Sequence, residues 1–229
     1  MEALTLSGTG LAVALIMGFL FVIFGGHLWW FFILGMMLFL VLSAMVTWIG
    51  KGYKSKKKLG QDPRGIRNVV ANGLMPLVIA GLYYLMMAIG KGDYASIFLF
   101  GFICSVAAIT ADKFASEIGV LGPMPISLIS GKRVRKGVSG GVTWLGLTVS
   151  ALAPLLIGLI LIPLALTTYS LGIGAYLAIA IVTLCGFLGS LVDSFLGYYE
   201  EKGIGNKFTS NFLCSIAGAA VGIILIVLF

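Results

Sequence analysis

Residues 97–119 read IFLFGFICSVAAITADKFASEIG. The stretch begins with fifteen uncharged residues and then reaches Asp112, Lys113 and Glu117. A helix needs about 20 mostly apolar residues to cross the hydrocarbon layer of a membrane, so this run and the residues before it predict a transmembrane helix. Ionisable residues at membrane depth are costly and are usually retained for function, so the end of this helix is the first candidate site.

The composition of the whole chain indicates a membrane protein. Of its 229 residues, 60% are hydrophobic and 10% are charged, and the mean hydropathy is +1.12. Soluble domains carry about 25% charged residues, which this chain falls far below. We therefore expect an integral membrane protein with membrane lipid around it and no nucleic-acid partner.

Apolar runs divide the chain into about seven spans, which predict an all-α, polytopic membrane helix bundle. The spans form one bundle, so we expect a single integral membrane domain over residues 1–229. The expected spans are residues 4–24, 28–50, 69–90, 94–111, 141–166, 170–198 and 208–229, with ends that hydropathy defines only to within a few residues.

The basic residues predict the orientation of these spans. Of the 15 Lys and Arg residues, seven lie in 51–67, five lie from Lys113 to Lys136, and two are Lys202 and Lys207. With seven spans these three segments fall on one side of the membrane, and only Lys91 falls on the other. Because basic loops stay inside, we expect a multi-pass protein of the cell membrane with its N-terminus cytoplasmic and its C-terminus outside.

Small and polar residues recur three or four positions apart along four of the spans, and each stripe brings a polar group toward the cytoplasmic side. Such stripes usually serve close helix packing, which is one interpretation. The other is that they line a polar pocket that opens to the cytoplasm. The stripes are Arg64, Asn68 and Asn72; Ser105, Ala108, Asp112 and Ser116; Gly186, Gly189, Ser190, Asp193 and Gly197; and Asn211, Ser215, Gly218 and Gly222.

A basic, glycine-rich loop precedes the fifth span. It contains Lys132, Arg133, Arg135 and Lys136, followed by Ser139, Gly140 and Gly141. A glycine-rich turn at a helix N-terminus offers unpaired backbone N–H groups to an anion, and nearby Arg and Lys add charge-assisted hydrogen bonds. The loop therefore predicts a phosphate site, although a basic loop that only orients the protein or contacts anionic lipid remains an alternative.

Enzymes that transfer phosphoryl or nucleotidyl groups combine carboxylates with an anion-binding loop of this kind. Mg²⁺ prefers carboxylate and phosphate oxygens, and it neutralises phosphate charge in such reactions. A site at the cytoplasmic membrane face can meet a nucleoside triphosphate from the water and the phosphate end of a lipid from the membrane. We therefore expect Mg²⁺ as cofactor, with Asp112, Glu117 and Asp193 as its ligands and as the catalytic carboxylates.

Five segments of the chain resemble the membrane family that includes plant phytyl-phosphate kinase and transmembrane protein nineteen. Within the second of them, Lys113 stands where that family usually has Thr. The segments are VVANGLMP (69–76), TADKFASEIGVLG (110–122), GVSGGVTWLG (137–146), GSLVDSFLG (189–197) and NKFTSNFLCSIAG (206–218).

The resemblance implies a membrane kinase that uses a nucleotide, typically CTP, to convert an isoprenoid monophosphate to the diphosphate. We expect a group of basic, amide and small residues to bind the phosphates of the nucleotide or of the acceptor. This group comprises Arg64, Arg67, Asn68, Asn72, Lys132, Arg133, Arg135, Lys136, Ser139, Gly140, Gly141 and Asn211.

Two other functions remain open. The loop ISGKRVRKGVSGG (129–141) is also similar to that of CTP-dependent phosphatidate cytidylyltransferases and dolichol kinases, so a cytidylyltransferase that makes a CDP-lipid is one alternative. The other is an ion-coupled transporter, because buried carboxylates and glycine-interrupted helices also serve ion coupling. The oligomeric state is likewise open, and a homo-oligomer is compatible with the sequence.

The orientation is testable by cysteine labelling in intact cells. Cysteines placed singly at Arg64, Lys132 and Glu200 should stay unlabelled by a membrane-impermeant reagent, whereas a cysteine at Lys91 should react, because basic loops are retained inside. Permeabilised cells supply the control, in which all four positions should react. Labelling of the first three positions without labelling of position 91 would contradict the orientation.

Overall fold

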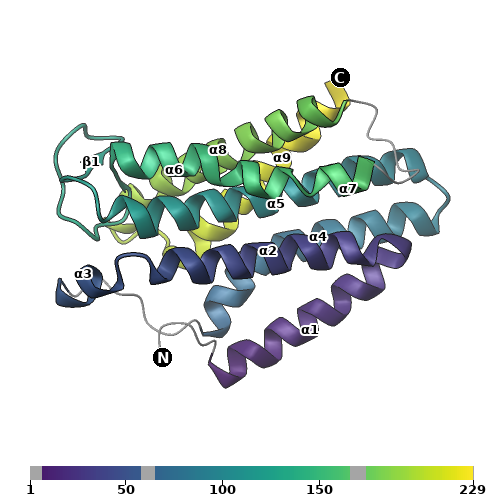
Figure 1. Cartoon of the computed structure of the whole chain (residues 1–229), viewed down its shortest axis with the longest axis horizontal. Coiled ribbons are helices and arrows are strands. Elements are labelled where there is room, and N and C mark those ends of the chain that lie inside the picture. The colour runs from purple at the N-terminus through teal and green to yellow at the C-terminus, as the bar shows by residue number, and fades with distance from the viewer. Residues whose placement is uncertain (1–6, 58–64, 166–173, 229) are drawn as a thin grey trace.

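Long helices make up most of the chain in the computed structural model, which describes residues 7–57, 65–165 and 174–228 (Figure 1). One short hairpin of two strands lies among them. The elements are α1 (Gly8–Gly25), the 3₁₀ turn η2 (Gly26–Leu28), α2 (Trp29–Trp48), α3 (Lys51–Lys56), α4 (Ile66–Ala88), α5 (Gly92–Gly119), β1 (Ile126–Ser127), β2 (Gly141–Val142), α6 (Trp144–Gly158), α7 (Leu161–Ala165), α8 (Ala175–Glu200) and α9 (Lys207–Leu228).

Six helical segments are long and apolar enough to cross a membrane, and the first of them, Gly8–Trp48, has 41 residues. A straight helix of that length would measure roughly 60 Å, about twice the hydrocarbon thickness. Instead the chain reverses at η2, where Gly26 adopts a φ of 53°. Figure 1 shows α1 and α2 running back along one another from this turn. The all-α, polytopic bundle is thus confirmed, with α1 and α2 as two of its crossings.

Several of the expected helix ends differ from the observed ones, and two of the differences have a clear cause. The helix expected to end at residue 111 continues as α5 to Gly119, so Glu117 lies on it, ion-paired with Lys113 one turn earlier. The span expected over 141–166 begins only at Trp144, since Thr143 caps α6 by accepting a hydrogen bond from the Gly146 amide. It also breaks before α7, which is consistent with the missing amide hydrogen of Pro163.

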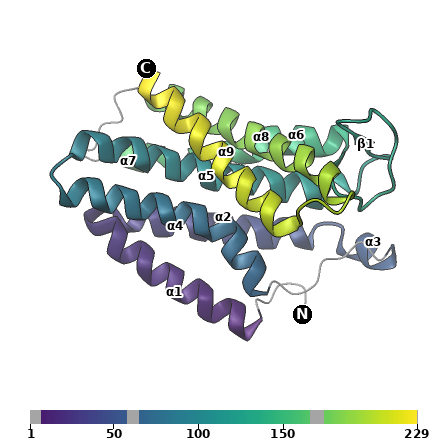
Figure 2. The same cartoon turned by 180° about the vertical axis from the view of Figure 1, so that it is seen from behind.

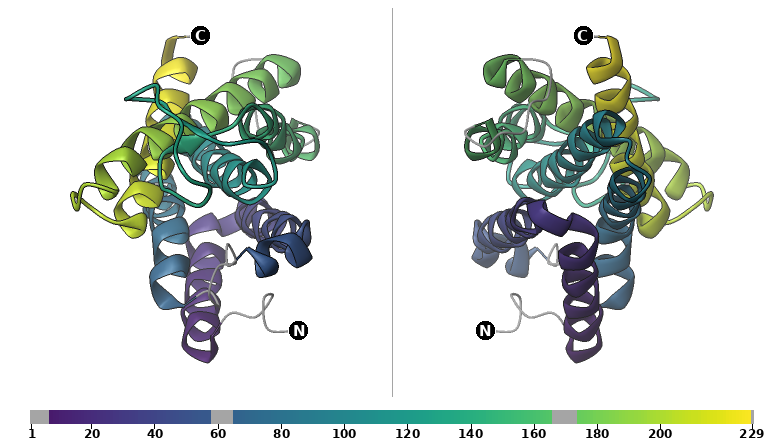
Figure 3. Two further views of the ribbon diagram at one scale, coloured as in Figure 1. Left: turned by 90° about the vertical axis from the view of Figure 1, so that its left-hand side faces the viewer. Right: turned by 90° about the vertical axis from the view of Figure 1, so that its right-hand side faces the viewer.

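Helix α5 is the centre of the bundle. Every residue from Leu99 to Asp112 is buried, and the helix packs against α2, α4, α6, α8 and α9. The end-on views in Figure 3 show α5 among these helices and α1 at the edge of the bundle. A helix that is apolar or small on all sides is suited to this position, because it has no face that requires water.

The small-residue stripes of α8 and α9 meet α5 at Ala108. A Cβ atom added to Gly189 would lie 2.5 Å from the Cβ atom of Ala108, and one added to Gly218 would lie equally close. These distances are too short for any side chain, so both glycines are required for close helix packing. The Ser105 and Ser215 hydroxyls, 2.6 Å apart, join α5 to α9 one turn deeper in the bundle.

Aromatic rings attach the first helices to α5 at the opposite end from the basic loops. Phe32 of α2 lies 4.6 Å from Phe102 of α5, measured between ring centroids, and Phe21 of α1 lies 5.8 Å from the same ring. Tyr83 of α4 completes the group at 5.3 Å from Phe32. We refer to these four residues as the aromatic cluster.

The described basic segments gather at one end of the bundle, as expected. Figures 1 and 2 show α3, the hairpin of β1 and β2, and the turn between α8 and α9 at that end, whereas Lys91 precedes α5 at the other. The hairpin is antiparallel, with Ile126 opposite Val142. The common side of these loops follows from the fold, and its identification as cytoplasmic stays a prediction.

Substitution of Gly189 by alanine should destabilise the bundle, because the new methyl group would overlap Ala108. Overpacking of this kind costs about 1–3 kcal/mol, measurable as a shift in chemical unfolding in detergent. Gly8→Ala is the matched control, since a Cβ atom there meets nothing within 4 Å. Adding Ala108→Gly to Gly189→Ala should recover part of the loss, and no recovery would contradict the proposed contact.

Candidate functional site

A cavity of about 1390 Å³ lies at the end of the bundle that carries the basic loops. Residues of α1, α2, α4, α5, α6, α8 and α9 line it, together with the glycine-rich loop before α6. Polar and charged side chains line the part near α5, α8 and α9, and apolar side chains line the part between α1 and α2. The cavity is therefore amphipathic along its length.

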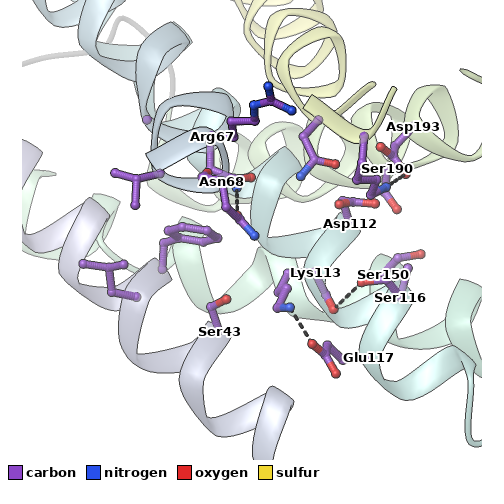
Figure 4. Close-up of a pocket in the computed structure, with 18 of the residues that line it drawn as sticks. Ser43, Arg67, Asn68, Asp112, Lys113, Ser116, Glu117, Ser150, Ser190 and Asp193 are labelled. Atoms are coloured by element: carbon purple, nitrogen blue, oxygen red, sulfur yellow. Dashed lines mark hydrogen bonds and ion pairs between the residues drawn. The ribbon is translucent and has the colours of Figure 1, made fainter. Parts of the chain in front are cut away.

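Two buried carboxylates mark the polar part. Asp112 of α5 and Asp193 of α8 are only 7% and 5% exposed, and their carboxyl groups lie within hydrogen-bonding reach of one another (Figure 4). The Lys207 ammonium, at the start of α9, donates to Asp193 Oδ2 at 2.7 Å. Two ionised carboxylates this close repel unless a proton or a cation lies between them. One lysine offsets only one of the two charges.

Oxygen atoms around this pair have unused acceptor capacity. Among the described residues, Asp193 Oδ1, Asn211 Oδ1 and Glu200 Oε1 are buried and accept no hydrogen bond. All three residues line the cavity. Buried carboxylate and amide oxygens that lack donors are the ligands that Mg²⁺ prefers. The Lys207 side chain is 49% exposed, and the carboxylate and amide oxygens beside it are of the type that binds a divalent cation.

Glu117 does not join this pair. Its carboxylate accepts from Lys54 at 2.6 Å and from Lys113 at 2.5 Å, and Thr47 Oγ1 donates at 3.1 Å. The reason is its place on the helix, five residues beyond Asp112 and on the side of α5 that faces α2 and α3. Within the described ranges, no three His, Cys, Asp or Glu side chains are grouped to hold a metal ion. The expected set of three carboxylate ligands therefore separates into an aspartate pair and a structural ion-pair cluster.

The glycine-rich turn packs against the end of α8 and already holds carboxylates. The Ser139 amide donates to Glu201 Oε1 at 2.8 Å, and its hydroxyl donates to Glu200 Oε2 at 2.6 Å. Gly140 has a φ of +75°, and a Cβ atom there would lie 2.5 Å from the Tyr198 amide nitrogen. The turn thus presents donors to carboxylate oxygens at the end of α8, and its expected role as a phosphate site stays a prediction.

Most of the basic loop lies outside the cavity, which corrects the expectation that it surrounds one ligand. Lys132, Arg133 and Arg135 are exposed on the hairpin, where Arg133 bridges Ile126 and the alternating Val134 turns inward against Gly141. The strand-like alternation therefore directs both arginines toward the exterior.

Lys136 differs from the rest of this loop because it lines the cavity. Its ammonium donates to the Tyr53 hydroxyl of α3 at 3.0 Å, and this hydrogen bond lowers the pKa of Tyr53. Lys136 therefore joins the loop to α3 at the rim of the site.

Three of the four residues expected at the site from the start of α4 and just before it line the cavity. Arg67, Asn68 and Asn72 line the cavity, and the Asn72 amide donates to the Asn68 side-chain and backbone oxygens at 2.8 Å each (Figure 4). Arg64 lies outside the described residues. Pro76 sits inside α4, where it removes the hydrogen bond to the Asn72 carbonyl, and Figure 2 shows the helix bending in this region.

Three lysines that pair with the predicted carboxylates were not among the predicted site residues. Lys113 has a signal in the sequence, since it stands four residues before Glu117 on the same helix. Lys207 is ion-paired with a residue 14 positions earlier, across the turn between two helices. Lys54 contacts a residue 63 positions away, and no local pattern indicates such a contact.

The chain resembles other membrane proteins over nearly its full length. The family described as "Integral membrane protein DUF92" matches residues 1–226. The uncharacterized membrane protein MJ0933 of Methanocaldococcus jannaschii is 32% identical over 222 residues, which cover 96% of this chain and 85% of that protein. Protein PGR of Arabidopsis thaliana is 28% identical over 177 residues, 71% of this chain and 62% of the plant protein. No solved structure shows a significant match.

The Glu117 cluster predicts an asymmetric response to substitution. Glu117→Gln should destabilise the protein by about 3–5 kcal/mol, because it leaves Lys54 and Lys113 without their common counter-charge. Lys54→Met should cost much less, since Lys113 still compensates Glu117. Chemical unfolding in detergent measures both, and equal losses would contradict a cluster organised by Glu117.

Proposed function

The chain belongs to the DUF92 family of integral membrane proteins, and from that premise we propose that it is a Mg²⁺-dependent lipid kinase. It transfers a phosphoryl group from a nucleoside triphosphate, CTP by resemblance, to an isoprenoid monophosphate. The reaction takes place at the cytoplasmic face of the cell membrane.

One observation carries the proposal: the five sequence segments that resemble the prenyl-phosphate kinases all contribute to one cavity. They come from α4, α5, the glycine-rich loop, α8 and α9, which are far apart in the chain. The lining members include Asn72, Asp112, Ser139, Asp193 and Asn211. Packing alone accounts for the glycines of these segments, but it does not account for their buried carboxylate and amide oxygens.

The cavity has room for two substrates. Pockets for a single small ligand usually measure about 300–1,000 Å³, and this one is larger. Its polar part opens beside the exposed loops, and its apolar part lies within the transmembrane region between α1 and α2. A water-soluble nucleotide and a lipid acceptor can therefore meet in it from two sides.

Asp112, Asp193 and Asn211 would hold Mg²⁺. The ion supplies charge neutralisation on the nucleotide phosphates when bound. Ser139, Lys136 and Lys207 bind the remaining phosphate charge, and the nucleotide displaces Glu201 from the Ser139 amide. Such preorganised donors supply most of the rate enhancement in phosphoryl transfer, because little other chemistry is required of the protein.

An oxygen of the acceptor monophosphate attacks the γ-phosphorus of the nucleotide. The bond between that phosphorus and the β–γ bridging oxygen breaks, so the products are the lipid diphosphate and the nucleoside diphosphate. A monophosphate oxygen is already nucleophilic at neutral pH, and for this reason the site needs no strong general base. The role of Arg67, Asn68 and Asn72 is to orient the acceptor phosphate on the α4 side of the cavity.

Product identification tests the proposal. Purified protein is incubated with CTP, Mg²⁺ and an isoprenyl monophosphate, and both products are identified. We expect CDP and the isoprenyl diphosphate. Pyrophosphate together with a CDP-lipid would indicate a cytidylyltransferase, because attack would then have occurred at the α-phosphorus. Absence of nucleotide binding would exclude both enzymes and favour a transporter.

Asp112→Asn and Asp193→Asn should each abolish transfer while leaving most of the stability intact. An amide fits the space of either carboxylate but binds Mg²⁺ poorly. Asp93→Asn is the matched control for Asp112, since it is on the same helix at the opposite end of the bundle. Turnover is measured alongside chemical unfolding. Near wild-type turnover in either variant would remove that aspartate from the site.

A further inference from the structure

The cavity extends well beyond the aspartate pair as an apolar groove between α1 and α2. Its walls include Leu15, Gly18 and Phe19 of α1 and Ile33, Met36 and Leu40 of α2. We refer to this part as the α1–α2 groove.

The groove exists because α1 packs against α2 only near its C-terminal end, whereas it stays in contact with α4 further along, for example where Met17 meets Gly73. The aromatic cluster fixes Phe21, near the C-terminal end of α1, against α2 and α5. Toward its N-terminal end, α1 diverges from α2, as Figures 1 and 2 both show. The space between the two helices therefore widens toward the end of the bundle that carries the aspartate pair.

The groove runs deep into the transmembrane region and opens sideways. Its α1 wall extends from Leu11 to Val22, which corresponds to roughly 16 Å of helix and about half of the hydrocarbon layer. Leu15 and Phe19 in this wall are each 66% exposed. A water-soluble substrate would not be stabilised by an apolar groove at this depth in the membrane, whereas a hydrocarbon chain from the membrane can enter between the helices.

Cationic and amide groups lie where the groove meets the polar part of the cavity. Figure 4 shows Asn68 of α4 and Lys113 of α5 facing this region, with Ser43 of α2 on the groove side and Asp112 beyond. The Lys113 ammonium is held in position by Glu117. Arg67 lines the cavity as well, but Figure 4 shows its side chain extending toward α9, on the other side of the cavity from Lys113. This charge pattern complements an anionic head group on an apolar chain.

We infer that the α1–α2 groove is the binding site for the hydrocarbon chain of the acceptor, a single-chain lipid monophosphate that enters sideways from the membrane. Its phosphate lies against Lys113 and Asn68, where it faces the nucleotide site. Gly18 lines the groove beside open space, because a Cβ atom there meets nothing within 4 Å. The inference rests on the proposed function and assigns the chain of its acceptor to particular helices.

A variant that fills the groove tests this assignment. Gly18→Trp places a large side chain into open space, so the fold should tolerate it. Gly8→Trp is the matched control, on the same helix, equally unobstructed and outside the cavity lining. Binding of geranylgeranyl monophosphate, dimethylallyl monophosphate and CTP is measured for both variants and for the unmodified protein in detergent.

We expect Gly18→Trp to weaken binding of geranylgeranyl monophosphate by about tenfold or more, the loss that follows when roughly two methylene groups leave the groove. Binding of the short-chain monophosphate and of CTP should not change, and Gly8→Trp should resemble the unmodified protein. Unchanged binding of the long-chain lipid, or an equal loss for all three ligands, would overturn the assignment. So would a failure of the unmodified protein to bind the long-chain monophosphate.

Chemical crosslinking separates this inference from the proposed reaction. A geranylgeranyl monophosphate that carries a photoreactive diazirine in its chain should label peptides of α1 and α2. Labelling there without phosphoryl transfer would retain the groove and reject the kinase. Transfer with labelling confined to other helices would retain the kinase and reject the groove.

Discussion

The close contact of α8 and α9 with α5 at Ala108 is the constraint on which the rest of the structure depends. Gly189 and Gly218 allow three helix backbones to approach at one level of the membrane, since neither position has room for a methyl group. Asp193 lies four residues after Gly189, and Asp112 lies four residues after Ala108, so each aspartate is one helical turn beyond the contact. The packing of these glycines is therefore what brings the two carboxylates together.

Burial of so many ionisable groups near a membrane is possible because nearly all of them have partners. Glu117, for example, lies between Lys54 and Lys113 and pairs with both. The aspartate pair differs from these groups, since Lys207 offsets one charge and buried oxygens nearby accept no hydrogen bond within the described part of the chain. The same membrane that makes an uncompensated carboxylate costly thus strengthens the attraction of this pair for a cation.

The two ends of the bundle differ in how closely their helices pack. At the end away from the basic loops, the aromatic cluster and η2 join α1, α2, α4 and α5 into a firm unit. At the other end the helices separate, α4 bends near Pro76, and the cavity forms between them. This arrangement suits the proposed lipid kinase, since its acceptor would have to leave the bilayer only far enough to bring a phosphate to the nucleotide while its chain remained among apolar side chains.

The amino-acid sequence by itself determined the helical class, the crossings, the common side of the basic loops, and the stripes that carry Asp112, Asp193, Asn72 and Asn211. These properties follow from hydropathy and helical periodicity, which are local. The tertiary structure decided which ionisable groups become partners: it paired Glu117 with Lys54, placed Lys207 on Asp193, and left Arg133 and Arg135 on the exposed hairpin. It also decided the groove between α1 and α2. The physical reason is that these contacts join residues distant in the chain, and their geometry depends on how closely helices approach and where they diverge, which no local pattern encodes.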